Sequence, residues 1–177
     1  MKKLALGLAA VACAVVPAMA HAQIASATVN ASATVQASLT AATTHQLKFG
    51  TLAMGASSTL ASSGASQASL SGLTTAGLGQ IQVGHNSNVS VTATVPATLL
   101  NSVSGQTLGF SATCATASSS GGMGTAVASC ASFSFSAAAP GTVQSTYVLV
   151  GGTVTGSAAA GVGTFTGDVD FTFTATN

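Results

Sequence analysis

Few side chains of this chain could carry out acid–base chemistry. Outside the first 22 residues the candidates are two histidines and two carboxylates: His45, His85, Asp168 and Asp170. A histidine oriented by a carboxylate is the base of a catalytic triad. Neither histidine has a carboxylate near it in the sequence, and the two aspartates alternate with Val169, which predicts the polar face of a strand. We therefore interpret the histidines as loop residues and the aspartates as exposed strand carboxylates, and we expect no catalytic residue and no enzyme activity.

The same residues offer little to a metal ion or a cofactor. Asp168 and Asp170 could donate oxygens to calcium, but no third carboxylate lies near them, and calcium takes about six to eight oxygen ligands. No cluster of histidines and cysteines has the spacing of a zinc site. The glycine-rich residues 118–125 lack the lysine and the following helix of a phosphate-binding loop. We expect neither a metal nor a cofactor.

Cys114 and Cys130 are predicted to form a disulfide, because Cys13 lies in an N-terminal segment that we expect to be removed. The bridge would close a loop of about sixteen residues, which contributes roughly 3 kcal/mol in the chain-entropy model. Strand alternation places Cys114 on the face of Phe110 but Cys130 on the face opposite to Phe133. A simple hairpin would therefore need a bulge or a bent loop end. Two unpaired buried thiols are the alternative.

Residues 1–22 have the pattern of a secretory signal peptide, with two lysines, an apolar run and alternating small residues. Cleavage after Ala20 or Ala22 is acceptable, and we prefer Ala22, which leaves a mature chain that begins at Gln23. Acylation of Cys13 is an alternative, but the large aliphatic residue expected three positions earlier is missing. The apolar run is shorter than the ~20 residues that span a bilayer, so we expect no membrane span in the mature chain. We expect secretion through the periplasm to the cell surface or the medium.

After this cleavage only Lys48, Asp168 and Asp170 carry a formal charge. A chain this close to neutral has no electrostatic footprint for nucleic acid or anionic lipid, and we expect neither as a partner. Its polar character comes from Ser, Thr, Asn and Gln, which do not repel a second copy. An uncharged surface favours association, so we expect self-association.

Alternation of apolar and polar residues recurs along the chain and predicts an all-β protein. The candidate strands are residues 47–54, 80–84, 88–96, 107–114, 131–137, 145–156 and 163–177. With the N-terminal stretch they suggest about eight or nine strands in an antiparallel β-sandwich. The phenylalanines available to its core are Phe110, Phe133, Phe135, Phe165, Phe171 and Phe173.

Residues 25–40 alternate over about three times the length of an ordinary strand. The segment ASATV occurs in them twice, six residues apart. An even shift keeps the apolar residues on one face, so either copy could present the same face to a groove.

Both ends of the chain resemble a secreted bacterial family, domain of unknown function 4402. An alternating strand leads to a Leu-x-Phe-Gly-Thr turn, and a Val-Gly-Gly-Thr hairpin is followed by a return strand. The matching residues are Leu47, Phe49, Gly50, Thr51, Val150, Gly151, Gly152, Thr153, Gly163, Phe165 and Gly167. The resemblance spans residues 31–177, with only the strand pattern matching in 56–145, and Lys48 and the scarcity of charge depart from many members. The family is in turn similar to archaic chaperone–usher pilins and to spore coat protein U domains.

This resemblance implies an immunoglobulin-like, pilin-like sandwich over residues 31–177 that lacks one strand. In such pilins each subunit supplies an N-terminal extension that completes its neighbour by β-augmentation. Residues 23–30 would be that extension, and the donor side chains would be Ala25, Ala27, Val29 and Ala31. A periplasmic chaperone and an usher are the implied partners. The alternative, left open here, is that residues 25–40 form one long edge strand of the chain's own sandwich, or a frayed tail.

The resemblance and the uncharged composition favour a non-enzymatic surface protein, a fimbrial or coat subunit that assembles by strand addition. The alternative is a monomeric secreted domain that binds a glycan or another component of the cell envelope. Exposed aromatic clusters would favour that alternative, but the chain has one tyrosine, Tyr147, and no tryptophan.

Overall fold

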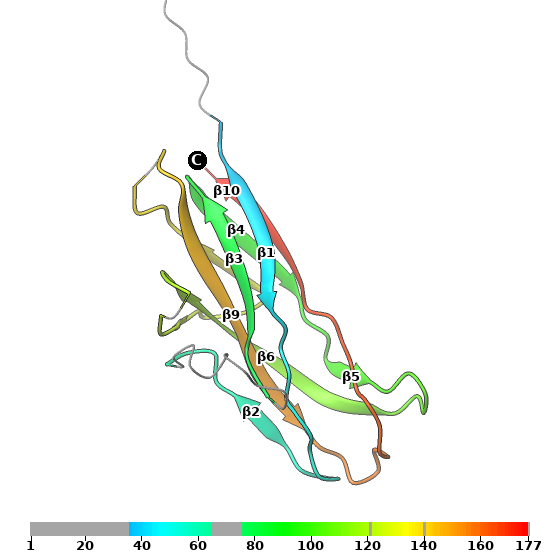
Figure 1. Cartoon of the computed structure of the whole chain (residues 1–177). Helices are drawn as coiled ribbons and strands as arrows, with labels where there is room; N and C mark the ends of the chain where they lie inside the picture. The colour runs from blue at the N-terminus through cyan, green and yellow to red at the C-terminus, as the bar shows by residue number, and fades with distance from the viewer. Residues whose placement is uncertain (1–35, 65–75, 121, 140, 177) are drawn as a thin grey trace, which may run out of the picture. The chain divides into compact units, whose positions relative to one another are not determined.

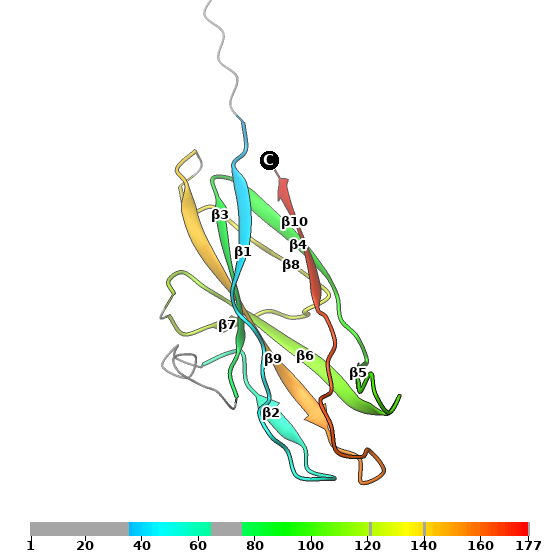
Figure 2. The same ribbon diagram turned by 45° about the vertical axis from the view of Figure 1, so that its right-hand side comes forward.

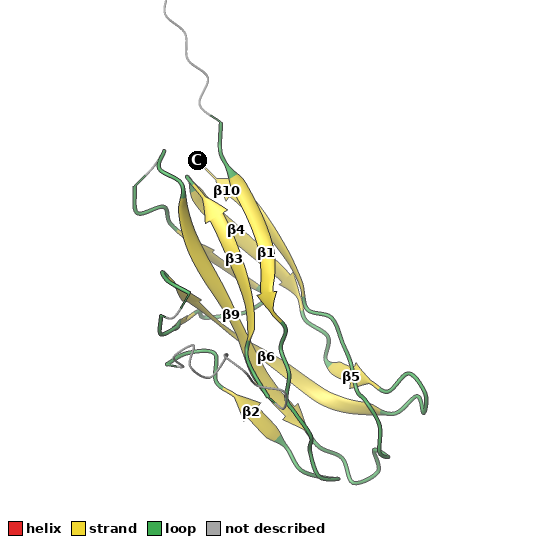
Figure 3. Cartoon of the chain, viewed as in Figure 1, coloured by secondary structure: helices red, strands yellow, loops and turns green. Residues whose placement is uncertain are grey.

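The computed structural model describes residues 36–64, 76–120, 122–139 and 141–176, all within one compact unit, Val35–Asn177. These residues form β-strands and loops and no helix (Figure 3), which confirms the all-β class. The described residues therefore contain no helix that could cross a membrane. The predicted boundaries of the signal peptide and of the N-terminal extension, and the candidate donor residues, lie outside the described part of the chain.

Ten strands lie in the described residues. They are β1 (Leu39–His45), β2 (Ser58–Leu60), β3 (Gly79–His85), β4 (Asn88–Thr94), β5 (Thr98–Leu100), β6 (Thr107–Ala117), β7 (Thr125–Ala126), β8 (Ser132–Phe135), β9 (Gln144–Thr155) and β10 (Asp170–Thr176). Every pairing between them is antiparallel, as predicted.

The strands form two sheets (Figure 1). The larger sheet has seven strands in the order β1-β3-β9-β6-β5, with β2 paired to β9 and β7 paired to β6. The smaller sheet has the order β10-β4-β8. Side chains of both sheets meet in one hydrophobic cluster, in which Val83, Val148 and Val150 of the larger sheet pack near Phe133 and Phe173 of the smaller one. The two sheets therefore enclose a core, as in a sandwich. The immunoglobulin-like topology stays a prediction.

Strand β9 is buried on both faces. Val148 and Val150 point into the core between the sheets, whereas Leu149 packs with Leu78 and Ala115 in a second cluster on the outer face of the larger sheet. Gly124 lies directly on that outer cluster, because a Cβ added to it would come within 2.9 Å of the Leu149 side chain. Burial on two sides explains why residues 147–150 are continuously apolar and do not alternate.

Two strand predictions are wrong. Residues 47–54 form no strand and make only an isolated bridge from Lys48 to Gly77, because the chain turns at Gly50 and Gly55, whose φ angles are 76° and 74°. The predicted hairpin at residues 150–153 does not exist either: Gly151 and Gly152 lie within the continuous strand β9. They are glycines because neighbouring strands approach closely there, as described below.

The strand predicted at residues 163–177 is confirmed in its second half, which forms β10, and is wrong at Gly163, Phe165 and Gly167. These residues lie in the connection between β9 and β10, where only Thr166 forms an isolated bridge, with Leu100. The chain then crosses to the other sheet, and β10 pairs with β4. Gly163 has a φ of 154°, and a Cβ there would collide with the Asn101 amide, so Gly163 permits a close approach of two loops.

The predicted disulfide between Cys114 and Cys130 is confirmed. Cys114 lies in β6 of the larger sheet, and Cys130 lies shortly before β8 of the smaller sheet, with 5.1 Å between the two Cα atoms. The bridge therefore links the two sheets across the core, and both cysteines are buried. A simple hairpin would have placed the two cysteines on opposite faces. No bulge is needed, because Cys114 and Cys130 lie in different sheets and are not partners in one hairpin.

Replacing both cysteines with alanine should lower the free energy of unfolding by about 3 kcal/mol without abolishing the fold. For a domain of this size that corresponds to a fall in melting temperature of about 10 °C. The remaining core, with Val83, Val89, Val91 and Val148 fully buried, is expected to hold the sheets together. Thermal unfolding of the double variant and of the reduced parent would test this, and an unchanged melting temperature in both would contradict it.

Candidate functional site

One side of the sandwich is open. Strands β1 and β10 lie next to each other there (Figures 1 and 2), at the border between the two sheets. Among the strands that the structure describes, each is the last of its sheet, since β1 pairs there with β3 alone and β10 with β4 alone. Both strands therefore present an edge of unpaired backbone N–H and C=O groups to the same space.

The core is incompletely covered on this side. Ala41 of β1 pairs with the fully buried Val83 and shares its core-facing side, but Ala41 is exposed. Phe171 and Phe173 of β10 pack against the core cluster and are only half-buried. Among the phenylalanines expected in the core, only Phe110 is buried. The others are half-buried, and four of them pack against the core cluster: Phe133, Phe135, Phe171 and Phe173.

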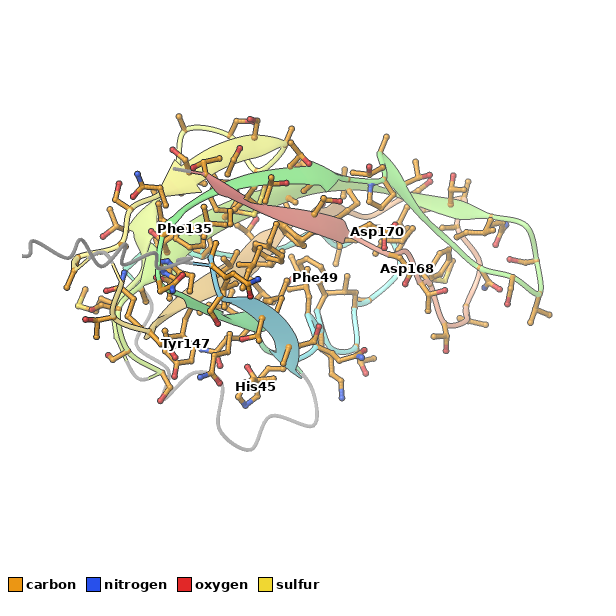
Figure 4. All side chains as sticks on the ribbon, turned by 90° about the horizontal axis from the view of Figure 1, so that it is seen from above. His45, Phe49, Phe135, Tyr147, Asp168 and Asp170 are labelled. Carbon is orange, nitrogen blue, oxygen red and sulfur yellow. A yellow bond between two sulfur atoms is a disulfide. The ribbon has the colours of Figure 1, made fainter. Side chains whose placement is uncertain are left out.

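A cleft of about 1000 Å³ continues the open side beyond the end of β1. Its walls are residues 46–56, which follow β1, and residues 160–171, which lead into β10. The apolar side chains along its floor come from β3, β6 and β9: Ile81, Leu108, Phe110, Val150 and Val154. Phe49 packs edge-to-face on Phe110, with 5.8 Å between ring centroids. In Figure 4, Phe49 is seen between β1 and the start of β10.

All the charged side chains that the structure describes line this cleft. Lys48 lies on one wall, and Asp168 and Asp170 lie on the other, and all three are exposed. Figure 4 shows Asp170 at the beginning of β10 and Asp168 in the segment before it, so the predicted strand position is confirmed for Asp170 and wrong for Asp168. The floor between them is apolar and carries no charge. Such a site can bind an extended, uncharged chain segment.

One of the two histidines, His45, lines the same cleft as Asp168 and Asp170, whereas His85 lies outside that lining. His45 ends β1, is exposed, and lies 3.2 Å from Gln80 Oε1 through its Nδ1. The prediction of a loop position is wrong for both histidines, because each of them ends a strand. His85 ends β3 and is fully buried. Its Nδ1 lies 2.7 Å from the carbonyl oxygen of Ser87 and its Nε2 lies 2.9 Å from Thr146 Oγ1. These bonds occupy both ring nitrogens, and no carboxylate takes part.

His85 is therefore a structural residue. Its ring packs edge-to-face on Phe135 of β8, with 5.0 Å between centroids, so it links the two sheets. Since Ser87 offers only a carbonyl oxygen, Nδ1 is the donor and Nε2 accepts from the Thr146 hydroxyl. Among the described residues no group of three or more His, Cys, Asp or Glu side chains could hold a metal ion.

Most residues of the family-like motifs meet in the cleft. Its lining includes Leu47, Phe49, Gly50 and Thr51 from one wall and Gly163, Phe165 and Gly167 from the other. Sequence reasoning did not place these two groups together, because more than a hundred residues separate them and no pattern links them. Gly151 and Gly152 lie apart from this lining, in the middle of β9.

Comparison of the sequence with protein-family models and with curated proteins, and of the structure with solved structures, finds no match.

Proposed function

We propose that this protein is a non-enzymatic structural subunit of the cell surface that assembles by β-strand addition. In this proposal the open side between β1 and β10 receives the N-terminal extension of a second copy. The observation that carries the proposal is the pair of unpaired strand edges on either side of an uncovered apolar core. An added strand would satisfy backbone groups on one of these edges and cover the half-buried phenylalanines.

The N-terminal extension has the composition that such a site requires. The predicted extension, residues 23–30, and the five residues that follow it contain no charged side chain, so burying them costs no desolvation of charge. Apolar residues alternate with Ser, Thr and Asn, which matches a strand with one face toward the core and one toward solvent. Val29 and Val35 are the largest apolar side chains on that face. They are therefore the residues expected to set the register.

Export to the cell surface and an assembly pathway complete the proposal. The signal peptide predicted at residues 1–22 and the disulfide between the sheets both fit an oxidising compartment. A subunit with an uncovered core is prone to non-specific association before it is assembled. A periplasmic chaperone that covers the open side, and an usher that exchanges it for the next subunit, are the partners that the family resemblance implies.

A second candidate function, binding of a neutral glycan by a monomer, is favoured by another feature. A shallow pocket of about 540 Å³ is lined by four serines, Ser118, Ser119, Ser120 and Ser136, and by residues 144–147 of β9. Tyr147 contributes the one aromatic ring of this pocket and is half-buried. Uncharged hydroxyls beside an aromatic ring suit a sugar. Binding of glycans by a protein that stays monomeric would favour this function over the first.

The proposed function is tested on the exported protein. Size-exclusion chromatography and electron microscopy of protein sheared from the cell surface should show polymers of regular width. Exclusively monomeric protein at all concentrations, with residues 23–30 intact by mass spectrometry, would contradict the proposal.

A further inference from the structure

The beginning of the described chain is held by the side chain of Asn86, in the turn between β3 and β4. Asn86 Oδ1 accepts a hydrogen bond from the backbone N–H of Ser38 at 2.7 Å. Asn86 Nδ2 donates to the backbone carbonyl of Gln36 at 3.3 Å. These are the backbone groups that an antiparallel neighbour would engage, so the amide extends the β1–β3 ladder beyond its last pair, Leu39 and His85.

Asn86 is itself well anchored. Its carbonyl oxygen accepts a hydrogen bond from the N–H of Gly141 at 2.9 Å, which ties the turn to the loop before β9. The preceding residue, His85, is fully buried and hydrogen-bonds to Ser87 and Thr146. The Asn86 amide therefore has little freedom to follow the chain if Gln36 and Ser38 move.

The N-terminal extension could otherwise fill the cleft of its own subunit. If residues 36–38 formed a three-residue loop, Val35 would lie opposite Leu39 and Ala33 opposite Ala41. This register keeps all apolar residues of the extension on the core-facing side, so the hydrophobic pattern does not disfavour it. The strand would pair with the free edge of β1 and close the subunit. A closed subunit could not accept a second copy.

The hydrogen bonds of Asn86 oppose that turn. They hold residues 36–38 in line with β1 (Figure 1). A three-residue hairpin loop also prefers glycine at its last position, where this chain has Ser38. Asn86 therefore stabilises the conformation in which residues 36–38 continue the line of β1, relative to the conformation in which they turn back toward β1.

We propose that Asn86 is a positioning residue that directs the N-terminal extension out along the line of β1, so that it completes a second copy and not its own subunit. The inference rests on the proposed function and adds a determinant of assembly between subunits. Asn86 affects the ratio of oligomers to monomers that are closed by their own extension. The affinity with which an extension binds to a second copy should not depend on Asn86.

The test measures backbone hydrogen exchange of residues 24–35 in separated monomer and oligomer fractions of exported protein. In the parent these amides should be protected in oligomers and unprotected in monomers. In Asn86→Ala the fraction of monomers with protected amides should rise about five-fold over the parent, because the variant loses two partly exposed hydrogen bonds. Adding Ser38→Gly should raise that fraction further, because glycine suits the last position of the hairpin loop.

Asn88→Ala is the matched control, because it removes a nearby side-chain amide that instead accepts from the N–H of Ala137 at 3.2 Å. It should leave the ratio of oligomers to closed monomers unchanged. If monomers of Asn86→Ala with Ser38→Gly stay as unprotected as those of the parent while oligomers are protected, the role of Asn86 is wrong and strand addition stands. If the parent forms no oligomers, or its oligomers leave residues 24–35 unprotected, the proposed function is wrong, and this inference falls with it.

Discussion

Val29→Asp should abolish assembly and leave a folded, exported monomer. In the proposed assembly Val29 enters the apolar floor of a second copy, where an aspartate would be buried without a partner. Burial of an unpaired carboxylate costs several kcal/mol, enough to weaken association by at least about a hundredfold. Asp168 and Asp170 on the wall of the cleft would add like-charge repulsion. Size-exclusion chromatography coupled to light scattering, with the melting temperature of the monomer, would measure both effects.

Thr28→Asp is the matched control for this variant. It places the same charge one residue away, on the face of the strand that alternation directs to solvent. It should assemble like the parent, and it reports any effect of the charge on export or on cleavage after Ala22. Assembly of Val29→Asp at the level of Thr28→Asp would contradict strand addition. A lowered melting temperature of the Val29→Asp monomer would instead indicate that residues 25–40 belong to the subunit's own sheet.

Most of the strands that could be predicted have one face on the core and one in solvent, whereas β9 contains an apolar run that is buried on both faces. Residues 80–84, 88–96, 107–114, 131–137 and 145–156 overlap β3, β4, β6, β8 and β9, and their bounds differ by at most three residues. In β4, for example, Val89 and Val91 are fully buried, whereas Thr92 is exposed. Alternation is a direct consequence of that environment and is therefore visible in the sequence.

Alternation was misleading where apolar residues line the cleft. Leu47 and Phe49 alternate with Gln46 and Lys48 like residues of a strand, but they belong to a turning segment that forms a wall. A local pattern records which side chains face apolar surroundings and does not show whether the backbone has a strand partner. The short strands β2, β5 and β7 were missed for the opposite reason, since two or three residues are too few to show a period.

Individual residues of the site could be predicted from the sequence, but their meeting in one cleft could not. The resemblance identified the motifs around Phe49 and Phe165, and the composition identified Lys48, Asp168 and Asp170 as the few charges. That all of them line one cleft depends on the crossing of the chain from β9 to the other sheet, which no local pattern encodes. The disulfide was predicted from the number of cysteines, but its position between the sheets also depends on that long-range topology.

The Gly-Gly pair of β9 has another role, from which we expect the largest loss of stability. Gly152 pairs with Ala112 of β6 on one side and with Leu60 of β2 on the other, and its φ is 149°. A Cβ at this position would overlap the carbonyl oxygen of Ser111 and come within 3.0 Å of the Ala112 Cα. These are backbone atoms of a central strand, so they cannot move aside as a flexible side chain could.

Gly152→Ala should therefore lower the free energy of unfolding by about 3–5 kcal/mol, a large part of the 5–15 kcal/mol typical of a domain. Gly109→Ala in β6 is the matched control, because its Cβ would meet the Thr155 Cβ at an ordinary 3.4 Å and its φ is not positive. Urea unfolding should place Gly109→Ala close to the parent and Gly152→Ala far below it, or yield no folded Gly152→Ala at all. Equal midpoints for the two variants would show that β6 and β9 can separate at Gly152 without cost, and the close approach would then not explain the glycine.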